Sequence, residues 1–378
     1  MTFGVMAPFT GPFAQAGTDL MKGVNLAVDE INAAGGVNGA HIQLITGDTA
    51  SDPTDASSAE SKLLNVDHVP VLVGPRTITG PTVIKQSERA RVPQFIVGGS
   101  TSLDKSTDKY FWRTTASDSQ QGTAMADYAL KNNLTTAALV FEKQPAAQTL
   151  KAPITDAYQR HGGQLVATVD IAPNQTSYRS EVQQIFAQHP KTVFFQVSSA
   201  TAGVLFPQIQ QAGFLTVPFI GTNTTSTSDF FSAIGPEIAN SVVSTQSSAP
   251  SGQGRAHYEQ IFNAKYNSKQ VANLSADMYD AVILAALAMD KAGTTTDSQA
   301  INDAVTQVSN PPGNVVNDYA SGLKAIKAGQ KVNYEGAAGS QDFDKYHNTF
   351  GPFDALKFAA DGSTQTVVTL SAAELASY

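Results

Sequence analysis

The sequence predicts an α/β fold with two Rossmann-like lobes, each built on a parallel central sheet. Two observations lead to this prediction. Apolar runs of strand length alternate with amphipathic segments of helix length, and the same order occurs twice along the chain. Such alternation is typical of a parallel sheet that helices cover on both faces. With 378 residues, the chain is long enough for two domains that each bury a core.

In the first part of the chain, expected strands alternate with expected helices, and the series begins and ends with a strand. Residues 2–7 form the first expected strand, and Leu20, Val24 and Ile31 fall on one face of the helix that follows. The glycine pair at 35–36 is expected to end that helix. The other expected elements here are strands at 41–46, 69–73 and 93–97 and helices near 54–66 and 80–91.

The same order returns after a short strand-like stretch at 110–114. This second set comprises strands at 136–141, 164–170, 192–197 and 217–220 and helices near 146–161, 178–188 and 201–212. Long helices at 252–266, 274–292 and 297–308 follow, and strand-like pieces close the chain at 353–358 and 365–370. The tail is therefore expected to divide between the lobes.

Composition argues against several classes of protein. A formal net charge of −8 without a basic cluster disfavours nucleic acid as a partner. The absence of cysteine excludes disulfides, thiolate nucleophiles and Cys-ligated zinc. The longest apolar run, residues 281–289, is too short for a bilayer core that needs about 20 residues, so a buried helix is expected. The histidines share no metal-ligand spacing, and neither a metal nor a cofactor is expected.

The sequence lacks the common catalytic motifs. It has no G-x-G-x-x-G after the first strand, no G-x-S-x-G, no G-x-x-x-x-G-K-[ST] and no H-E-x-x-H. The stretch GGSTS at 98–102 is the nearest to a nucleophile turn, but no expected cleft loop holds a histidine that would activate Ser100. We therefore expect no enzyme and no catalytic residue.

The loops after the strands indicate a binding function. Ligands of open parallel sheets bind outside the carboxyl ends of the strands. Six loops at these ends are rich in Gly, Ser, Thr, Asn or Gln and hold hardly an ionisable group: 7–17, 74–81, 98–104, 142–148, 198–203 and 221–229. If the lobes face each other, these loops line a cleft that suits a small polar ligand. The alternative is that ordinary turns and helix caps use the same residue types.

Residues 5–53 resemble the opening of type I periplasmic binding proteins, in the branched-chain or hydrophobic amino-acid branch of ABC-importer receptors. The likeness continues through VPQFIVGGSTS, SDSQQGTAMADYAL, MYDAVILAALAMDKAG and VNYEGAAGSQDFD, and so covers nearly the whole chain. The resemblance implies two lobes joined by three crossover strands, a small-molecule ligand trapped by hinge closure, and an ABC transporter permease as partner.

The resemblance also implies where the chain divides. We expect lobe I to comprise 1–116 and about 248–335, lobe II to comprise 117–247 and about 336–378, and the crossings to lie near 115–118, 245–250 and 335–340. The protein is expected to be a monomer and to contact the membrane only through the permease or a lipid anchor. Met1 directly precedes a strand, which indicates that an export signal has been removed and that the protein works outside the cytoplasmic membrane, in the periplasm or as a cell-surface lipoprotein.

Family members hold the carboxylate of their ligand with hydroxyls and backbone N–H groups of the first lobe. The matching positions here are Thr77, Thr79, Gly99, Ser100 and Thr101. In amino-acid binders of the family, two tyrosines and an acidic residue of the second lobe meet the ammonium group. The places of these three residues align with Ala146, Ser198 and Asn223.

The second-lobe positions disfavour a plain α-amino acid, because a buried ammonium without a carboxylate partner costs on the order of several kcal/mol. The predicted ligand is a small organic compound: a carboxylate, aromatic acids included, a bulkier neutral compound or an amino-acid derivative. Phe9 and Phe13 are the stacking candidates. Phe13 is equally compatible with a place in the core. Arg76 either grips a carboxylate or covers a helix end, and the second interpretation is favoured.

Two alternatives remain. The first is a hydrophobic or branched-chain amino-acid binder in which Asn223 or Glu142 meets the ammonium group. The second is a sensory ligand-binding domain of the same fold.

Overall fold

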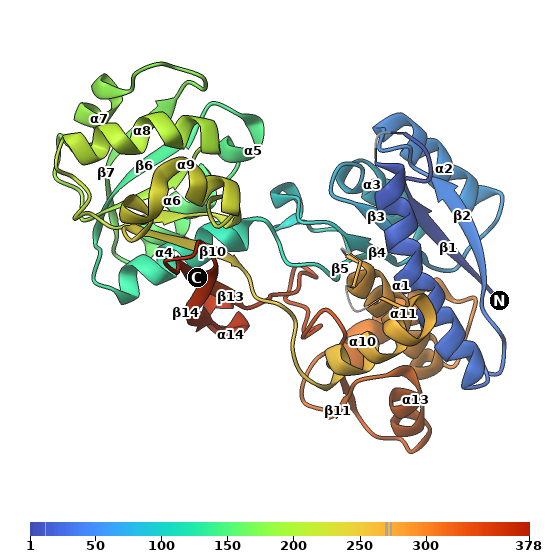
Figure 1. The fold of residues 1–378 in the computed structure, drawn as a ribbon. Helices are drawn as coiled ribbons and strands as arrows, with labels where there is room; N and C mark the ends of the chain where they lie inside the picture. Colours follow the sequence, from blue (N-terminus) through green and yellow to red (C-terminus); the bar gives the residue numbers. More distant parts are fainter. Residues whose placement is uncertain (12, 269–270, 273) are drawn as a thin grey trace. The chain divides into compact units, whose positions relative to one another are not determined.

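In the computed structural model, the chain forms two units, which are described separately here (Figure 1). The structure describes residues 1–11, 13–268, 271–272 and 274–378. Unit 1 comprises Met1–Ser117 and Ala249–Phe350, and unit 2 comprises Asp118–Ser248 and Gly351–Tyr378.

Unit 1 is built on a five-stranded parallel sheet in the order β2-β1-β3-β4-β5. Its strands are β1 (Thr2–Ala7), β2 (Gln43–Asp48), β3 (Leu72–Arg76), β4 (Gln94–Val97) and β5 (Phe111–Arg113). A small parallel sheet pairs β11 (Asn314–Val316) with β12 (Val332–Tyr334). The helices are α1 (Ala14–Ala33), α2 (Pro53–Asn65), α3 (Gly80–Ala90), the 3₁₀ helix η1 (Thr101–Leu103), α10 (Gln253–Tyr266), α11 (Ser275–Ala292), α12 (Ser298–Ser309) and α13 (Tyr319–Lys327).

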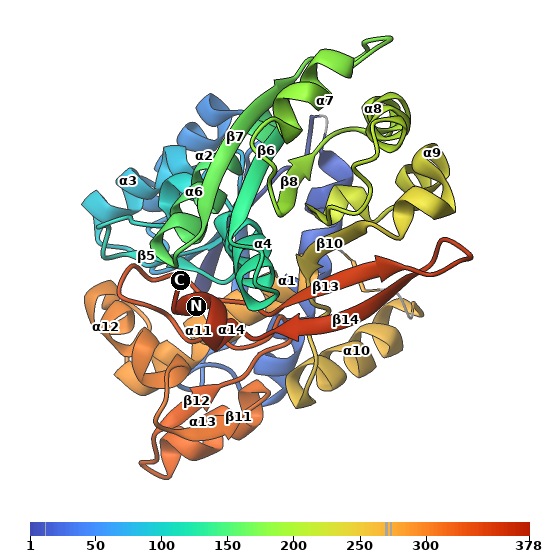
Figure 2. The same ribbon diagram turned by 90° about the vertical axis from the view of Figure 1, so that its left-hand side faces the viewer.

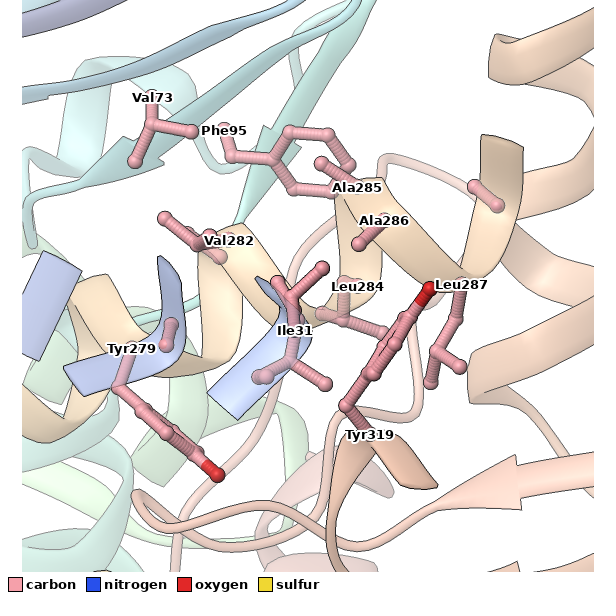
Figure 3. Packing of buried hydrophobic residues seen from close by; sticks show 14 of the residues in the cluster. Ile31, Val73, Phe95, Tyr279, Val282, Leu284, Ala285, Ala286, Leu287 and Tyr319 are labelled. Carbon is pink, nitrogen blue, oxygen red and sulfur yellow. The ribbon is translucent and has the colours of Figure 1, made fainter. Parts of the chain in front are cut away.

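Alternate side chains of the strands face two separate cores in unit 1, because successive residues of a strand point to opposite faces of the sheet. Phe3 and Val5 belong to a large cluster with α1 and α11, whereas Met6 belongs to a smaller cluster with α2 and α3. Residues 281–289 of α11 are fully buried in the large cluster, as the sequence predicted (Figure 3). In the described part of the chain, none of the helices combines the length and the hydropathy of a membrane span.

The last crossing lies later in the chain than 335–340, the expected position, and follows Phe350. The reason is Asp280, a buried carboxylate of α11 that accepts hydrogen bonds from the backbone N–H groups of Ala337 and Ala338 at 2.8 Å each. Because a buried carboxylate needs such donors, the turn that supplies them stays with α11 in unit 1.

Unit 2 holds a seven-stranded sheet in the order β14-β13-β10-β9-β8-β6-β7. Five strands are parallel: β6 (Thr136–Glu142), β7 (Gln164–Ile171), β8 (Thr192–Gln196), β9 (Phe219–Gly221) and β10 (Val242–Ser247). The antiparallel pair β13 (Phe353–Phe358) and β14 (Thr364–Leu370) extends the sheet beside β10 (Figure 2). The helices are α4 (Ser119–Lys131), α5 (Pro145–Gln148), α6 (Lys151–Arg160), α7 (Arg179–Phe186), α8 (Ser199–Gln211), the 3₁₀ helix η2 (Asn223–Thr225), α9 (Ser228–Ala239) and α14 (Ala372–Ala376).

Unit 2 also buries both faces of its sheet. Val140 packs in a cluster with α7, α8 and α9, and its neighbour Leu139 packs on the other face with α4 and α6. Two α/β units with parallel central sheets confirm the predicted fold class. The helix expected near 146–161 is instead two helices, α5 and α6. Sequence reasoning missed α9, whose pattern Gly235 and Pro236 interrupt.

Candidate ligand-binding site

Strands β1, β3 and β4 are neighbours in the parallel sheet of unit 1, so the loops after them lie at one edge of that sheet. Thr77 follows β3 and Gly99 follows β4. The backbone N–H of Gly99 donates to the Thr77 hydroxyl at 3.0 Å. The structure therefore brings together the two first-lobe loops that were predicted to hold a carboxylate.

Ser100 and Thr101 lie at the start of the 3₁₀ helix η1 after β4. The Ser100 hydroxyl is 2.9 Å from the Ser102 hydroxyl, while the Thr101 hydroxyl has no hydrogen-bond partner within the described chain. Arg113, which is fully buried, donates to the Ser100 carbonyl at 2.8 Å and forms an ion pair with Asp104 at 2.6 Å. Arg113 thus fixes this loop from behind, a role that the sequence did not reveal.

The loops after β1, β2 and β3 enclose a small pocket within unit 1. We call it the Arg76 pocket, and its lining residues are Pro8, Phe13, Thr49, Ser51, Arg76, Thr77, Ile78 and Thr79. Four predicted site residues lie here, namely Phe13, Arg76, Thr77 and Thr79. Sequence reasoning missed Thr49 and Ser51, because the loop after the second strand was not among the loops compared.

The two predicted stacking residues differ in their surroundings. Phe13 is 47% exposed at the start of α1, which excludes the alternative that it is a core residue. Phe9 is partly buried and packs against the large cluster of unit 1. An exposed ring beside a pocket is available for contact with an apolar ligand. Phe13 is therefore the better stacking candidate of the two.

Asp48 holds the loop after β1 in place. Its carboxylate accepts hydrogen bonds from the Phe9 N–H at 2.8 Å, the Thr10 N–H at 3.3 Å, the Thr10 hydroxyl at 2.6 Å and the Ala50 N–H at 2.9 Å. Burial alone would raise the pKa of Asp48, but these hydrogen bonds outweigh burial and lower that pKa below its usual value. The carboxylate is thus ionised and engaged by its own loop.

In unit 2, the polar residues of the loops bond to one another. Glu142 at the end of β6 is only 2% exposed, and it accepts hydrogen bonds from the Ser198 N–H at 2.6 Å and the Ser198 hydroxyl at 3.1 Å. The Thr201 hydroxyl donates to the same carboxylate at 2.8 Å. Glu142, considered from sequence as a contact for an ammonium group, is therefore the anchor for the start of α8.

The other predicted positions of unit 2 do not join this network. Asn223 is exposed at the start of η2, and no hydrogen bond links its side chain to Ser198 or to another described residue. Ala146 belongs to α5, but its side chain lies outside the described residues. The structure thus brings Phe13, Arg76, Thr77 and Thr79 of unit 1 to one pocket, whereas no hydrogen bond joins Ser198 and Asn223 in unit 2.

The loops at the carboxyl edge of the unit 1 sheet have the chemical groups needed to bind an anion. Unit 1 presents hydroxyl, N–H and guanidinium donors at the carboxyl edge of its sheet, which suits a carboxylate. Where side chains are described, no group of three or more His, Cys, Asp or Glu residues gathers in a way that would hold a metal ion.

Comparison with known proteins agrees with this chemistry. Residues 1–361 match a family model described as "Periplasmic binding protein". The chain is 26% identical over 308 residues to the Leu/Ile/Val-binding protein homolog 3 of Brucella melitensis biotype 1, covering 81% of this chain and 83% of the relative. It is 25% identical over 356 residues to the chemotactic signal transduction system substrate-binding protein BasB of Halobacterium salinarum, covering 90% of this chain and 83% of the relative.

A solved structure shares the fold. The solute-binding protein of an ABC transporter from R. palustris, in complex with benzoate, superposes with a TM-score of 0.62 at 17% identity, covering 98% of this chain and 96% of that protein.

Proposed function

We propose, from the premise that this chain belongs to the periplasmic binding protein family, that it is an extracytoplasmic solute-binding receptor of an ABC importer. Its ligand is a small organic carboxylate, aromatic acids included, which it delivers to a permease. The observation that carries this proposal is the unpaired Thr79 hydroxyl, which lines the Arg76 pocket although Thr79 is only 2% exposed. The names of the Brucella relative and the R. palustris protein support the same class.

In this proposal, unit 1 anchors the ligand. The Thr77 hydroxyl, which accepts from the Gly99 N–H, and the hydroxyls of Ser100 and Thr101 donate to the carboxylate. Ser198, Asn223 and Ala146 of unit 2 are proposed to complete the enclosure when the units close on the ligand. The chain catalyses no reaction and needs no cofactor.

A thermal-shift screen of amino acids, aromatic acids and small amides tests the ligand class. A ligand at 100 times its dissociation constant adds about 2.7 kcal/mol of apparent stability. We expect the largest shifts from carboxylates that lack an ammonium group. A panel without any shift contradicts the receptor proposal.

Small-angle X-ray scattering with and without the best compound tests closure. We expect the radius of gyration to fall on binding and the compound to be recovered unchanged. An unchanged scattering profile together with turnover of the compound would show that the chain is an enzyme.

A hydrophobic amino acid is the second candidate ligand, because the Brucella relative is named a Leu/Ile/Val-binding protein. Calorimetry with leucine, valine and alanine decides between the two. Micromolar binding, about −8 kcal/mol, that is lost in Asn223→Ala would favour the amino acid.

A sensory role is the second candidate function, because the chain resembles BasB over 90% of its length. Affinity purification from the native membrane separates the roles. A permease that co-purifies supports import, and a signalling receptor that co-purifies supports sensing.

A further inference from the structure

We infer that the Arg76 pocket binds the anionic group of the ligand, and that the ligand of this receptor is therefore a net anion. This inference rests on the proposed function and adds Arg76 and Thr49 as residues that determine specificity. Neither residue belongs to the neutral donors on which the carboxylate prediction depended.

Two hydroxyls of the pocket lack hydrogen-bond partners in the described structure, and one of them is buried. Thr49 is 1% exposed, and its hydroxyl oxygen is buried without a hydrogen bond in the described structure. The Thr79 hydroxyl also has no hydrogen bond to a described residue, but its oxygen is not buried. Buried polar groups are almost always hydrogen-bonded, and Thr49 and Thr79 line the same pocket. The missing partner of the Thr49 hydroxyl is therefore expected to be a ligand that accepts hydrogen bonds.

The charge of Arg76 is also uncompensated. Arg76 lines the pocket, and its guanidinium has neither an ion pair nor a hydrogen bond to any described residue. The two acids of the neighbouring β2 loop are engaged elsewhere: Asp48 by the loop after β1, and Asp52 by the N–H groups at the start of α2, at 2.7 and 3.2 Å. A planar guanidinium with free donors matches a carboxylate in both charge and shape.

Two helices begin at the pocket. Phe13 is the N-cap residue of α1 and Thr79 is that of α3, and neither side chain caps its helix. The positive ends of the two helix dipoles favour an anion at this place. The helix ends thus add to the attraction that Arg76 and the two hydroxyls already provide.

The loops of unit 2 provide no buried charge that is free to balance an ammonium group. Glu142 is buried and bonded to Ser198 and Thr201, and the remaining charges, Lys143 and Asp229, are exposed and opposite in sign. The ammonium group of a bound zwitterion would therefore have no dedicated partner, whereas the carboxylate of a simple acid is matched by the charge of Arg76.

The test compares compounds that share a skeleton and differ in charge. The probes are benzoate and benzamide, and 4-methylpentanoate, 4-methylpentanamide and leucine, each titrated by calorimetry into the wild type, Arg76→Gln and Arg179→Gln. Arg179 is an exposed arginine of unit 2 and serves as the matched control. In the wild type and in Arg179→Gln, we expect at least one carboxylate to bind about tenfold or more tightly than its amide. In Arg76→Gln, we expect that carboxylate and its amide to bind with equal affinity.

Thr49→Val provides a second measurement that does not depend on the charge of the probe. Because the Thr49 hydroxyl has no partner, its removal is expected to leave the melting temperature of the ligand-free protein unchanged or higher, and to weaken carboxylate binding. A lower melting temperature would show that the hydroxyl is bonded within the protein and overturns its assignment.

The outcomes separate the two proposals. Amides or leucine that bind as tightly as the carboxylates, or a carboxylate preference that survives Arg76→Gln, overturn the net-anion inference and leave the receptor proposal standing. Absence of binding by these probes and by the whole thermal-shift panel overturns both.

Discussion

The two units carry the same kinds of side chain at the carboxyl ends of their strands but use them in opposite ways. In unit 1, Thr49, Arg76 and Thr79 line a pocket without partners in the described structure. In unit 2, Ser198 and Thr201 are bonded to a buried Glu142. A loop rich in hydroxyls is therefore not by itself a binding surface, since its donors can be engaged within the protein, as those of Ser198 and Thr201 are.

This difference assigns different tasks to the units. A fully bonded polar network makes its surroundings rigid, so the network of Glu142 gives unit 2 a fixed framework around α8. Donors that lack partners keep their capacity for a ligand, so unit 1 offers the anchor. Changes in unit 2 should therefore alter folding first, and changes in unit 1 should alter binding first.

The largest effect is expected from Glu142→Ala, which removes the acceptor of the Ser198 N–H and of two hydroxyls. Hydrogen bonds to a charged group contribute about 1.5–3 kcal/mol each, so we expect unfolding to become easier by about 3 kcal/mol or more. Glu237→Ala, an exposed position of α9, should stay within about 0.5 kcal/mol. Urea unfolding followed by circular dichroism measures both.

Tryptophan fluorescence can show in which unit Glu142→Ala lowers the stability. Trp112 is the only tryptophan of the sequence and belongs to unit 1. Glu142→Ala should therefore shift the circular dichroism transition more than the fluorescence transition. Equal shifts of the two signals would contradict a role confined to unit 2.

A matched pair of glycines is expected to give the next effect. A Cβ atom at Gly17 in α1 would lie 2.0 Å from the Pro8 carbonyl oxygen, beside the Arg76 pocket, whereas at Gly203 in α8 the nearest atom would be 3.4 Å away. Gly17→Ala should destabilise the fold by about 1–3 kcal/mol and weaken ligand binding, because α1 must move. Gly203→Ala should stabilise it by up to about 1 kcal/mol through helix propensity. Similar melting temperatures for the two variants would contradict this contrast.

The pH dependence of stability offers a third test within unit 1. Burial raises the pKa of Glu60 in α2 from the ordinary 4.5 to about 8. In the unfolded chain this carboxyl ionises near 4.5, so its contribution to stability is complete below that pH and is lost as the pH rises to about 8. Glu60→Gln cannot ionise, and the stability of the wild type relative to this variant should fall between pH 5 and 8 by at most about 1.4 kcal/mol per pH unit.

The control for this pH series is Glu237→Gln, which should run parallel to the wild type. Buried Asp280, with a pKa raised by burial to about 7, also contributes to the slope of the wild type, and it remains in both variants. Only the difference between wild type and Glu60→Gln therefore reports Glu60. Parallel curves for these two proteins would show that Glu60 ionises as readily in the folded state as in the unfolded chain.

Much of the fold could be predicted from the sequence, because strand and helix periodicity is local. Residues 281–289, for example, were predicted to form a buried helix, and they lie in the buried helix α11. The state of the polar groups could not be predicted, because it depends on distant contacts. Glu142 and Ser198 are 56 residues apart in the chain, and nothing near Glu142 in the sequence indicates that its carboxylate is bonded to the start of α8. Thr49 was missed because the loop after the second strand was not among the loops compared, and only the folded chain brings that loop to the β3 loop at the Arg76 pocket.

The smallest effect is expected from Asn223→Ala in unit 2. The Asn223 side chain is exposed and has no hydrogen bond to any described residue, so its loss should change the free energy of unfolding by less than about 0.5 kcal/mol. If unit 2 only completes the enclosure, a single neutral hydrogen bond to the ligand is at stake, which corresponds to about 3- to 10-fold in affinity for the best carboxylate. Calorimetry on this variant beside Arg76→Gln measures the ratio. A loss in Asn223→Ala that equals or exceeds the loss in Arg76→Gln would place the anchor in unit 2 and reverse the comparison.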